Sequence, residues 1–462
     1  MSKLYMSLTL ILTLAFGVKA QVFPTTSWSD NTDVSWYDAS QDQFTITTAE
    51  ALAGVSLLVE QGTTFDGKTL NIMADIDLDA HLWTPIGTGT NFPFSGTVDG
   101  GNFTISNLWI NLPNGDFVGL FGQVTNATFS NITIDTSNIL AEDTAGTLVG
   151  NLSVNSNMAN CHVRNISLTA SSYNVGGLVG SVLTNSNITK CSVSGDVTAL
   201  NQVGGLAGSA WDNSSITESF SEGTVSGGYL IGGLVGYCTF AFVPNTQNII
   251  NNCYSRSIIT ASSGRAGGIY GGTDDALVLN NSYATGTVTA PEFAGAVIGA
   301  YGSGNITVGN TYFDLDSSQM TNGVGGYLGA PATPDINGRT TPDMKTSAIV
   351  DLLNAGATNN PWTIDATRND GYPILGSLLS VNQNTVAVSE TVVYPTVFTD
   401  RITVSSTAQL QSFSMYSITG ALVLEGDLSQ NNTIQPQTLS AGVYILNITT
   451  DKGMITKKVI KQ

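Results

Sequence analysis

The apolar positions of this chain recur in a short phrase that ends in glycine. The phrase is present seven times, as FVGLFG, AGTLVG, VGGLVG, VGGLAG, IGGLVG, AGGIYG and AGAVIG, ending at Gly122, Gly150, Gly180, Gly208, Gly236, Gly271 and Gly299. Successive final glycines are 28, 30, 28, 28, 35 and 28 residues apart. A recurrence of about 28 residues is typical of stacked repeats, in which no unit buries its apolar face alone.

Each phrase predicts a buried strand. Two residues before the final glycine, every copy has an aliphatic residue: Leu120, Leu148, Leu178, Leu206, Leu234, Ile269 and Val297. A short apolar run bounded by glycines is too short for a helix and favours a strand in a core. We interpret each phrase as one strand and each period as one turn of a parallel β-solenoid with about seven 28-residue turns. The final glycine indicates either a positive φ or a position without room for a Cβ atom.

The polar positions between the phrases predict the rest of each turn. A Ser/Asn-rich segment leads into a second short strand, as in SNITKCSVSGDVTA at 186–199. The 35-residue period carries an insertion after Gly236, YCTFAFVPNT, in which Phe240 and Phe242 are candidate ligand contacts. Insertions in repeat proteins emerge on one face, often the binding face. The alternative is that these residues fold back over the turn.

The chain begins with a different pattern. Residues 1–20, MSKLYMSLTLILTLAFGVKA, combine a basic residue with an apolar run and small residues before Gln21. This pattern predicts a secretory signal peptide cleaved between Ala20 and Gln21, with an apolar part too short for a membrane anchor. No other stretch approaches a transmembrane helix.

Caps are expected on both sides of the repeats at 118–325. Within 21–117, a capping signal at Thr47 or Thr48 predicts a helix through about Glu60, followed by strand-like segments. We interpret this region as a cap with one or two irregular turns, because a helix over the open core protects the first strand edge. Residues 326–380 contain a further helix signal and are expected to close the other end.

A separate domain is expected at the C-terminal end. Residues 381–391 are polar and form a plausible linker, and residues 392–462 contain about six short strand patterns separated by turn signals. Such spacing predicts a small β-sandwich. The fold class is therefore all-β, a capped parallel solenoid followed by a small sandwich.

Charge narrows the range of partners. The chain has 34 acidic and 15 basic residues, which gives a net charge of −19. Nucleic acid requires clustered cations and is excluded as a partner, and an anionic polysaccharide would be repelled by the bulk surface. The hydrophobic content of 42% is ample for a packed core.

Three cysteines occupy equivalent positions of their repeats: Cys161, Cys191 and Cys253. Cys161 and Cys191 would stack in neighbouring turns of an exported protein, which makes a disulfide between them one possibility. The alternative is a ladder of small, buried thiols.

No catalytic motif accompanies the two histidines, His81 and His162. A zinc protease would need His-Glu-x-x-His, and a serine hydrolase typically carries a Gly-x-Ser-x-Gly elbow; neither is present. A glycan hydrolase needs paired carboxylates in one groove, and close pairs occur only at Glu142-Asp143, Asp274-Asp275 and Asp314-Asp316 within the repeats. We therefore expect no enzyme activity.

One of these pairs could bind an ion. Asp314 and Asp316 alternate, so on a strand they would share a face and could hold a structural calcium ion. The alternative is that they are ordinary turn and solvent-facing acids. No other cofactor is expected. Among the aromatic residues, Trp211 follows a glycine corner and is a candidate sugar-stacking residue.

Two resemblances carry the most specific information. The repeats with their Gly-Gly-Leu-Val-Gly core resemble GLUG-motif repeats of bacterial surface proteins, and the flanking segments resemble those that accompany such repeats. Residues 392–462 resemble the type IX secretion C-terminal sorting domain of Bacteroidetes. The landmarks that match are Tyr394, Pro395, Phe398, Asp400, Gly420, Gly442, Tyr444, Lys457 and Lys458; the usual Pro-Asn-Pro entry is replaced by Pro-Thr-Val.

The second resemblance implies passage through the outer membrane by the type IX machinery, removal of the sorting domain, and anchoring on the cell surface or release. We expect an adhesin-like solenoid that binds glycans, surfaces or other cells. The alternatives are a polysaccharide-active lyase or hydrolase and a structural surface spacer.

Overall fold

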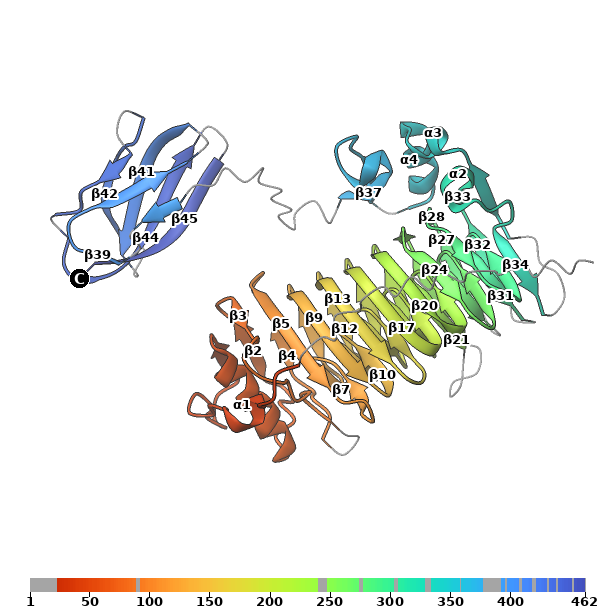
Figure 1. Ribbon diagram of the computed structural model, residues 1–462, viewed down its shortest axis with the longest axis horizontal. Helices are drawn as coiled ribbons and strands as arrows, with labels where there is room; N and C mark the ends of the chain where they lie inside the picture. Colours follow the sequence, from red (N-terminus) through yellow and green to blue (C-terminus); the bar gives the residue numbers. More distant parts are fainter. Residues whose placement is uncertain are drawn as a thin grey trace, which may run out of the picture. The chain divides into compact units, whose positions relative to one another are not determined.

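The computed structural model describes residues 23–88, 92–239, 247–273, 277–302, 306–328, 334–357, 359–376, 392–394, 397–406, 409–417, 421–429, 432–437, 439–450 and 453–461. Its contacts divide the chain into two compact units, Met1–Leu378 and Leu379–Gln462. The first unit is a parallel β-solenoid and the second is built of small, mainly antiparallel sheets, which confirms the expected fold class (Figure 1).

Three parallel sheets run along the length of the solenoid, and each turn of the chain adds strands to them. The first has ten strands, namely β1 (Gln43–Ile46), β2 (Thr69–Ile72), β4 (Thr97–Asp99), β8 (Thr128–Ser130), β12 (Asn157–Ala159), β16 (Asn187–Thr189), β19 (Ser215–Thr217), β22 (Asn248–Asn251), β27 (Leu277–Asn280) and β32 (Ile306–Gly309). The second has eight, namely β7 (Phe121–Thr125), β11 (Val149–Ser153), β15 (Val179–Val182), β18 (Ala207–Trp211), β21 (Val235–Thr239), β26 (Tyr270–Thr273), β31 (Ile298–Tyr301) and β34 (Val324–Tyr327).

The third sheet has seventeen strands. They are β3 (Ile76–Asp77), β5 (Thr104–Asn111), β6 (Asp116–Val118), β9 (Thr133–Ala141), β10 (Asp143–Gly146), β13 (His162–Ala170), β14 (Val175–Gly176), β17 (Ser192–Gly204), β20 (Phe220–Gly232), β23 (Tyr254–Ser255), β24 (Ile258–Ala261), β25 (Arg265–Gly267), β28 (Tyr283–Ala284), β29 (Val288–Thr289), β30 (Phe293–Gly295), β33 (Thr311–Asp314) and β35 (Ile336–Arg339).

The solenoid begins earlier than the repeated phrase. It has about 9 turns of about 29 residues, and its first turns precede the phrase that ends at Gly122. Phe44, Leu70, Val98 and Phe129 are in register on successive strands of the ten-stranded sheet. All four are buried. The early turns therefore share the core of the repeats although they lack the glycine phrase.

The phrase itself spans a corner rather than one strand, so that part of the prediction is wrong. In the copy AGTLVG, β10 ends at Gly146 and β11 begins at Val149. The two residues between them form the bend, and the second, Leu148, is fully buried. The aliphatic column thus lies at the inside of the corner, where leucines from successive turns stack on one another.

The glycine that ends each phrase is required for space. None of the seven lies in the left-handed region of φ. A Cβ atom at Gly180 would lie 2.5 Å from the carbonyl oxygen of Gly150 and 2.7 Å from the amide nitrogen of Ala145. Of the two explanations for this glycine, the lack of room for a side chain is confirmed.

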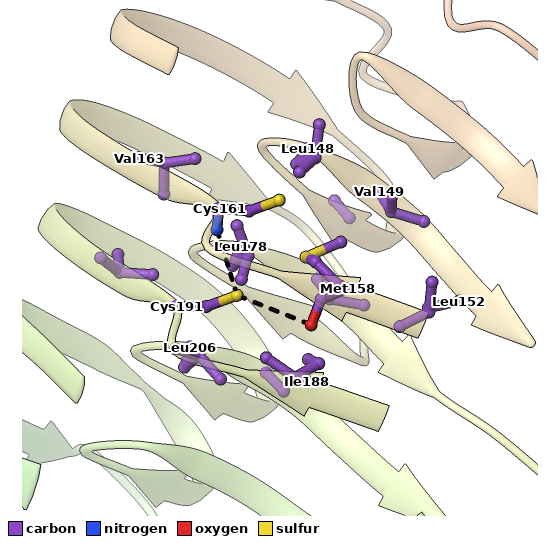
Figure 2. Close-up of a cluster of buried hydrophobic side chains, with 14 of the residues drawn as sticks. Leu148, Val149, Leu152, Met158, Cys161, Val163, Leu178, Ile188, Cys191 and Leu206 are labelled. Carbon is purple, nitrogen blue, oxygen red and sulfur yellow. Dashed lines mark hydrogen bonds between the residues drawn. The ribbon is translucent and has the colours of Figure 1, made fainter. Parts of the chain in front are cut away.

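Figure 2 shows the buried cluster beside this corner, with Leu148, Leu178 and Leu206 stacked next to Cys161 and Cys191. All four cysteines are buried. The amide N–H of Cys161 donates to Sγ of Cys191 at 3.4 Å, and that thiol in turn lies 3.3 Å from the carbonyl oxygen of Thr189. The two cysteines stack as expected, each as a separate thiol.

The N-terminal cap has the predicted helix. The helix α1 (Ala49–Glu60) begins after Thr48, whose side-chain oxygen accepts a hydrogen bond from the amide of Ala51 at 3.2 Å. A short 3-10 helix, η1 (Trp28–Asp30), packs against it. At twelve residues, α1 is too short to cross a membrane, and the part of the chain described here contains no helix long and apolar enough to do so.

The C-terminal cap covers the side of the last turns. It consists of α2 (Leu315–Ser318), α3 (Thr341–Met344), α4 (Ser347–Asn354), β36 (Trp362–Ile364), η2 (Asn369–Gly371) and β37 (Pro373–Leu375). Its apolar residues pack on an outward-facing aromatic column formed by Phe220, Tyr254, Tyr283 and Tyr312. Phe220 and Tyr254 stack with ring centroids 4.5 Å apart, and Tyr254 and Tyr283 with centroids 5.0 Å apart.

The C-terminal unit contains two sheets around its own core. One joins β38 (Val392–Tyr394), β40 (Ile402–Ser405) and β43 (Thr433–Ile434), and the other joins β39 (Val397–Phe398), β45 (Gly453–Lys461), β44 (Gly442–Thr450), β41 (Leu410–Ser417) and β42 (Leu422–Asp427). Phe398, Met415, Leu446 and Val459 are among the residues buried between them. This arrangement agrees with the small sandwich expected from the strand pattern.

Candidate functional site

A column of hydroxyl side chains runs along the outside of the seventeen-stranded sheet. Thr169, Thr198, Ser226, Thr260 and Thr289 (the threonine column) are in register on successive turns. The residue before each is buried, so the hydroxyl side chains face outward. The sequence analysis missed this column because threonine suits any strand, although the recurring tripeptides SLT, DVT, TVS, IIT and TVT were its signal.

The geometry of the column is set by the backbone. Parallel strands lie about 4.7–4.9 Å apart, so the column presents hydroxyl groups at that interval. The Oγ1 atom of Thr198 and the Oγ atom of Ser226 are 2.9 Å apart, which is a hydrogen bond between turns. A second outward column beside it contains Ser167, Asp196 and Thr224. This second column continues into Ile258, which is 54% exposed. The hydroxyl groups of the threonine column thus lie beside a surface that is sparsely charged and partly apolar.

Each of the four cations in the turns between residues 118 and 325 lies near a carboxylate. Arg164 pairs with Asp135 at 3.0 Å, Lys190 with Glu218 at 4.0 Å and Arg265 with Glu292 at 3.6 Å. The fourth cation, Arg256, lies 4.0 Å from Glu222 and forms an ion pair with Asp370. These turns therefore present no cation without a nearby carboxylate to an anionic ligand.

Arg256 joins the solenoid to the C-terminal cap. Besides its ion pair with Asp370, its guanidinium donates to Oδ1 of Asn369 at 2.6 Å and lies over the ring of Tyr372. The hydrogen bond from Arg256 lowers the pKa of Asp370. Burial raises the pKa of Glu222, and the positive charge of Arg256 partly offsets that rise. Because these groups bind one another across the two parts, we assign the cluster a structural role.

The proposed calcium pair has a different geometry from the one expected. The strand β33 ends at Asp314, and Asp316 lies in the first turn of α2, so the two do not alternate on one strand. Asp314 is fully buried, and its carboxylate accepts hydrogen bonds from the hydroxyl groups of Tyr372, at 2.6 Å, and Thr341, at 2.7 Å. It also accepts from the amide of Ser317 at 3.0 Å. These hydrogen bonds use the same carboxylate oxygens of Asp314 that would have to bind a calcium ion.

The other carboxylates do not gather. Across the described ranges of the chain, no three His, Cys, Asp or Glu side chains are grouped as a metal ion requires. In the pair Glu142-Asp143, the carboxylate of Asp143 accepts hydrogen bonds from the hydroxyl groups of Thr144 and Ser172 at 2.7 and 3.0 Å. The pair Asp274-Asp275 lies outside the described residues.

The expected contact residues are only partly placed. Trp211 is half-buried at the end of β18, and its carbonyl oxygen accepts a hydrogen bond from the hydroxyl of Ser214 at 2.5 Å. Phe240 and Phe242 lie outside the described residues, as do Ala20 and Gln21 at the expected signal cleavage site. The threonine column, in contrast, lies wholly within the described residues.

The sorting landmarks lie mainly in the packing of the C-terminal unit. Phe398 is 2% exposed, and the ammonium group of Lys461 lies 5.5 Å from the centre of its ring. Tyr444 is also buried, and its hydroxyl donates to the carbonyl oxygen of Ser440 at 2.8 Å. Gly442 pairs with Lys461 between β44 and β45.

The structure describes the side chains of only some of the remaining sorting landmarks. Asp400 and Lys457 are exposed. The structure gives only the backbone of Tyr394 and Lys458, and Pro395 and Gly420 lie outside the described residues.

Comparisons with known proteins agree with both parts of this architecture. The model of the GLUG motif matches residues 171–198 and 199–226, and the model of the secretion system C-terminal sorting domain matches residues 392–462. A solved structure from Bacteroides ovatus, described as a "putative immunoglobulin A1 protease", aligns with 72% of this chain and 92% of its own at 17% identity and a TM-score of 0.42.

Two curated proteins are similar over shorter stretches. Halomucin of Haloquadratum walsbyi is 28% identical over 132 residues, and a Gly-rich membrane protein of Evansella cellulosilytica, itself a tentative assignment, is 33% identical over 97 residues. These stretches are 27% and 20% of this chain. The matches span only 1% and 11% of the length of those relatives.

The chain is thus a secreted β-solenoid protein with GLUG repeats. It carries a type IX C-terminal sorting domain, which directs it through the secretion machinery to the outer surface or the extracellular space.

Proposed function

We propose that the solenoid is an adhesin-like module that binds neutral glycans outside the cell without cleaving them. The observation that carries this proposal is the threonine column. A row of exposed hydroxyl groups at the spacing of parallel strands offers hydrogen bonds to a polymer that itself presents hydroxyl groups at regular intervals.

Charge favours a neutral ligand over an anionic one. The chain has a net charge of −19, and each of the four cations of the repeat turns lies near a carboxylate. An anionic polysaccharide would have to displace those carboxylates and overcome the overall repulsion. A neutral glycan would neither have to displace those carboxylates nor be repelled by the net charge.

The state of the carboxylates favours binding over cleavage. Asp314 is buried and fully engaged in hydrogen bonds, and Asp143 is held by two hydroxyl groups. Glycoside hydrolysis needs two carboxylates across one groove, with one of them free to transfer a proton. With their oxygens held in these hydrogen bonds, Asp314 and Asp143 are poorly suited to that role.

The test measures retention of the secreted protein on insoluble neutral glycans while the same tubes are assayed for released sugar ends. The triple variant Thr169→Val, Thr198→Val and Thr260→Val keeps the strand shape but removes three hydroxyl groups. Since each hydrogen bond contributes about 0.5–1.5 kcal/mol, retention should weaken by at least about tenfold. The matched control, Thr128→Val, Thr189→Val and Thr217→Val on the ten-stranded sheet, should retain wild-type binding.

Other outcomes would contradict the proposal. Release of reducing or unsaturated ends would make the protein a polysaccharide-active enzyme. Absence of both retention and products across neutral glycans would favour a structural spacer. Equal loss of retention in both triple variants would show that the threonine column is not the binding face.

A further inference from the structure

The strands of the seventeen-stranded sheet bend shortly after the threonine column. Three residues occupy the same position of this bend in consecutive turns: Tyr173, Asn201 and Tyr229. The amide of Asn201 donates to the carbonyl oxygen of Ser172 at 3.0 Å, which places Asn201 beside Tyr173, and Asn201 pairs directly with Tyr229. Two tyrosines therefore lie two turns apart on one line parallel to the solenoid axis, with an asparagine between them.

The side chains at this bend form an exposed apolar surface. Tyr173 is 43% exposed, and Leu200, the neighbour of Asn201, is 54% exposed. Leu200 lies over the backbone of the next turn, since a Cβ atom at Gly228 would be 3.5 Å from its Cδ1 atom. Exposed large apolar side chains that lie together on a surface mark an interaction site. We call Tyr173, Leu200 and Tyr229 the tyrosine edge.

The ring of Tyr229 is held in place by the next turn. Tyr229 is half-buried, and its ring rests on Gly264, where a Cβ atom would lie 1.9 Å from its Cδ2 atom. The guanidinium of Arg265 lies 5.1 Å from the centre of the ring and pairs with Glu292 at 3.6 Å. The exposed part of the ring is thereby pre-organised, which lowers the entropy cost of binding a ligand.

The distance between the two tyrosines selects one type of polymer. Neighbouring parallel strands are about 4.7–4.9 Å apart, so two turns span about 9.4–9.8 Å. In an extended β-1,4-linked chain of hexopyranose rings, each ring is turned over relative to the one before it, so the same face recurs at every second ring, after a similar length. A chain along the axis would present equivalent faces to both tyrosines, whereas an α-1,4-linked chain coils and loses this match.

We propose that the tyrosine edge binds an extended, β-1,4-linked neutral glycan that lies parallel to the solenoid axis. The first and third of three consecutive rings would stack their apolar C–H faces on Tyr173 and Tyr229. The side-chain amide of Asn201 would donate to the middle ring, and the threonine column runs alongside, two residues before Leu200 in β17. The inference rests on the proposed glycan binding and names the linkage and the direction of the bound chain.

The test titrates the full secreted protein in a calorimeter with two series of neutral oligosaccharides, each of two to six rings. One series is β-1,4-linked (cello-oligosaccharides) and the other is α-1,4-linked (malto-oligosaccharides). In the β-1,4 series, affinity should rise about three- to tenfold from two rings to three, because the third ring is the first to reach the second tyrosine. The α-1,4 series should show no such step.

Single variants locate the contact. Tyr173→Ala removes an exposed ring and should weaken the β-1,4-linked tetrasaccharide about three- to tenfold, whereas Tyr173→Phe should bind like the wild type because the ring makes the contact. Tyr327→Ala is the matched control. Tyr327 is similarly exposed, at 46%, but belongs to the eight-stranded sheet, so its loss should leave affinity unchanged.

A double exchange tests the spacing itself. Tyr173→Asn combined with Asn201→Tyr keeps the composition of the bend but brings the two rings to neighbouring turns. It should weaken the β-1,4-linked tetrasaccharide at least as much as Tyr173→Ala does, and thermal unfolding checks that each variant is folded.

Equal affinity for both series, or wild-type affinity in Tyr173→Ala, would overturn the inference. If the threonine-column variant alone then loses retention on insoluble neutral glycans, the proposed function stands without the tyrosine edge. If Tyr173→Ala weakens binding while the threonine-column variant retains glycan normally, the tyrosine edge stands and the threonine column is overturned. Absence of binding to every neutral glycan would overturn both.

Discussion

The amide nitrogen of Cys161 lies 3.4 Å from the sulfur of Cys191, one turn further along the solenoid. The amide of Cys191 in turn donates to Oγ of Ser219 at 3.0 Å, and the amide of Cys253 donates to Oγ of Ser282 at 3.1 Å. Each side chain also lies within hydrogen-bond distance of a carbonyl oxygen two residues earlier in its own turn. Cysteine and serine interchange at this position because both side chains are small, and both can accept one hydrogen bond and donate another.

We expect the thiols to be unreactive in the folded protein. Burial raises the pKa of Cys253 to about 12 and that of Cys191 well above its usual value, so the reactive thiolate is scarce near neutral pH. Alkylation followed by mass spectrometry should leave all four cysteines unmodified until denaturant is added, and should then label all four. A pair that stays unlabelled in denaturant without reductant would reveal a disulfide.

The same ladder predicts the effects of substitution at Cys191. Cys191→Ser should change the free energy of unfolding by less than about 1 kcal/mol, because the hydroxyl replaces both contacts. Cys191→Ala should cost about 1–3 kcal/mol, because it leaves the buried amide of Cys161 without an acceptor. Urea denaturation measures both. If the two variants were equally stable, the thiol would act only as apolar filling.

The corner glycines should not tolerate a side chain. Gly180→Ala places a Cβ atom 2.5 Å from a backbone oxygen of the neighbouring turn, and backbone cannot move aside in one turn alone. We expect a loss of at least about 3 kcal/mol in unfolding free energy, at the upper end for overpacking. Gly356→Ala is the control. It has a φ of +73° but open space around it, and should cost only about 1–2 kcal/mol.

His162 should make the solenoid sensitive to mild acid. Burial, with a smaller effect from Arg164, lowers its pKa from 6.5 to about 4. The unfolded chain therefore takes up a proton below pH 6.5 that the folded chain accepts only near pH 4, so stability falls as the pH drops through that window. Unfolding free energies at pH 7 and pH 4.5 should differ less in His162→Asn than in the wild type. An unchanged difference would contradict this assignment.

Protonation of Asp314 should destabilise the C-terminal cap at low pH. Burial raises its pKa, but hydrogen bonds from Tyr372, Ser317, Thr341 and Asp316 together outweigh burial, and the pKa lies below its usual 3.8. This contribution to stability is present above pH 3.8 and is lost as the pH falls below that value. Hydrogen exchange of α4 should rise in that range, and Asp314→Asn should show the faster exchange already at pH 7. Tyr372→Phe, which removes one donor, should give an intermediate rate.

The period of the phrase was enough to predict the solenoid, but not its corners or its full length. Leu148 looks like a strand residue in the sequence because its neighbours are apolar, and only the packing of adjacent turns puts the bend there. The early turns around Phe44 and Leu70 were partly missed because an alternating core residue is a weaker signal than a glycine phrase. Asp316 was wrongly placed on a strand because Asp314 caps the short helix α2. A helix of four residues is too short to produce a periodic pattern in the sequence.

The candidate sites depend on distant parts of the chain. Thr198 and Thr260 have no special sequence context, and they form a column only when turns of unequal length are in register. Local patterns predict elements, whereas a binding surface depends on how those elements are stacked.

The lateral position of the C-terminal cap has a mechanical consequence. Phe220, Tyr254, Tyr283 and Tyr312 come from four consecutive turns, and all pack in the cluster that holds the cap. Tension that enters the solenoid from its C-terminal side would be shared across these turns as shear, rather than peeling the last strand from its neighbour one hydrogen bond at a time. In a solenoid each turn otherwise contacts only the turns next to it, whereas the C-terminal cap contacts several turns at once.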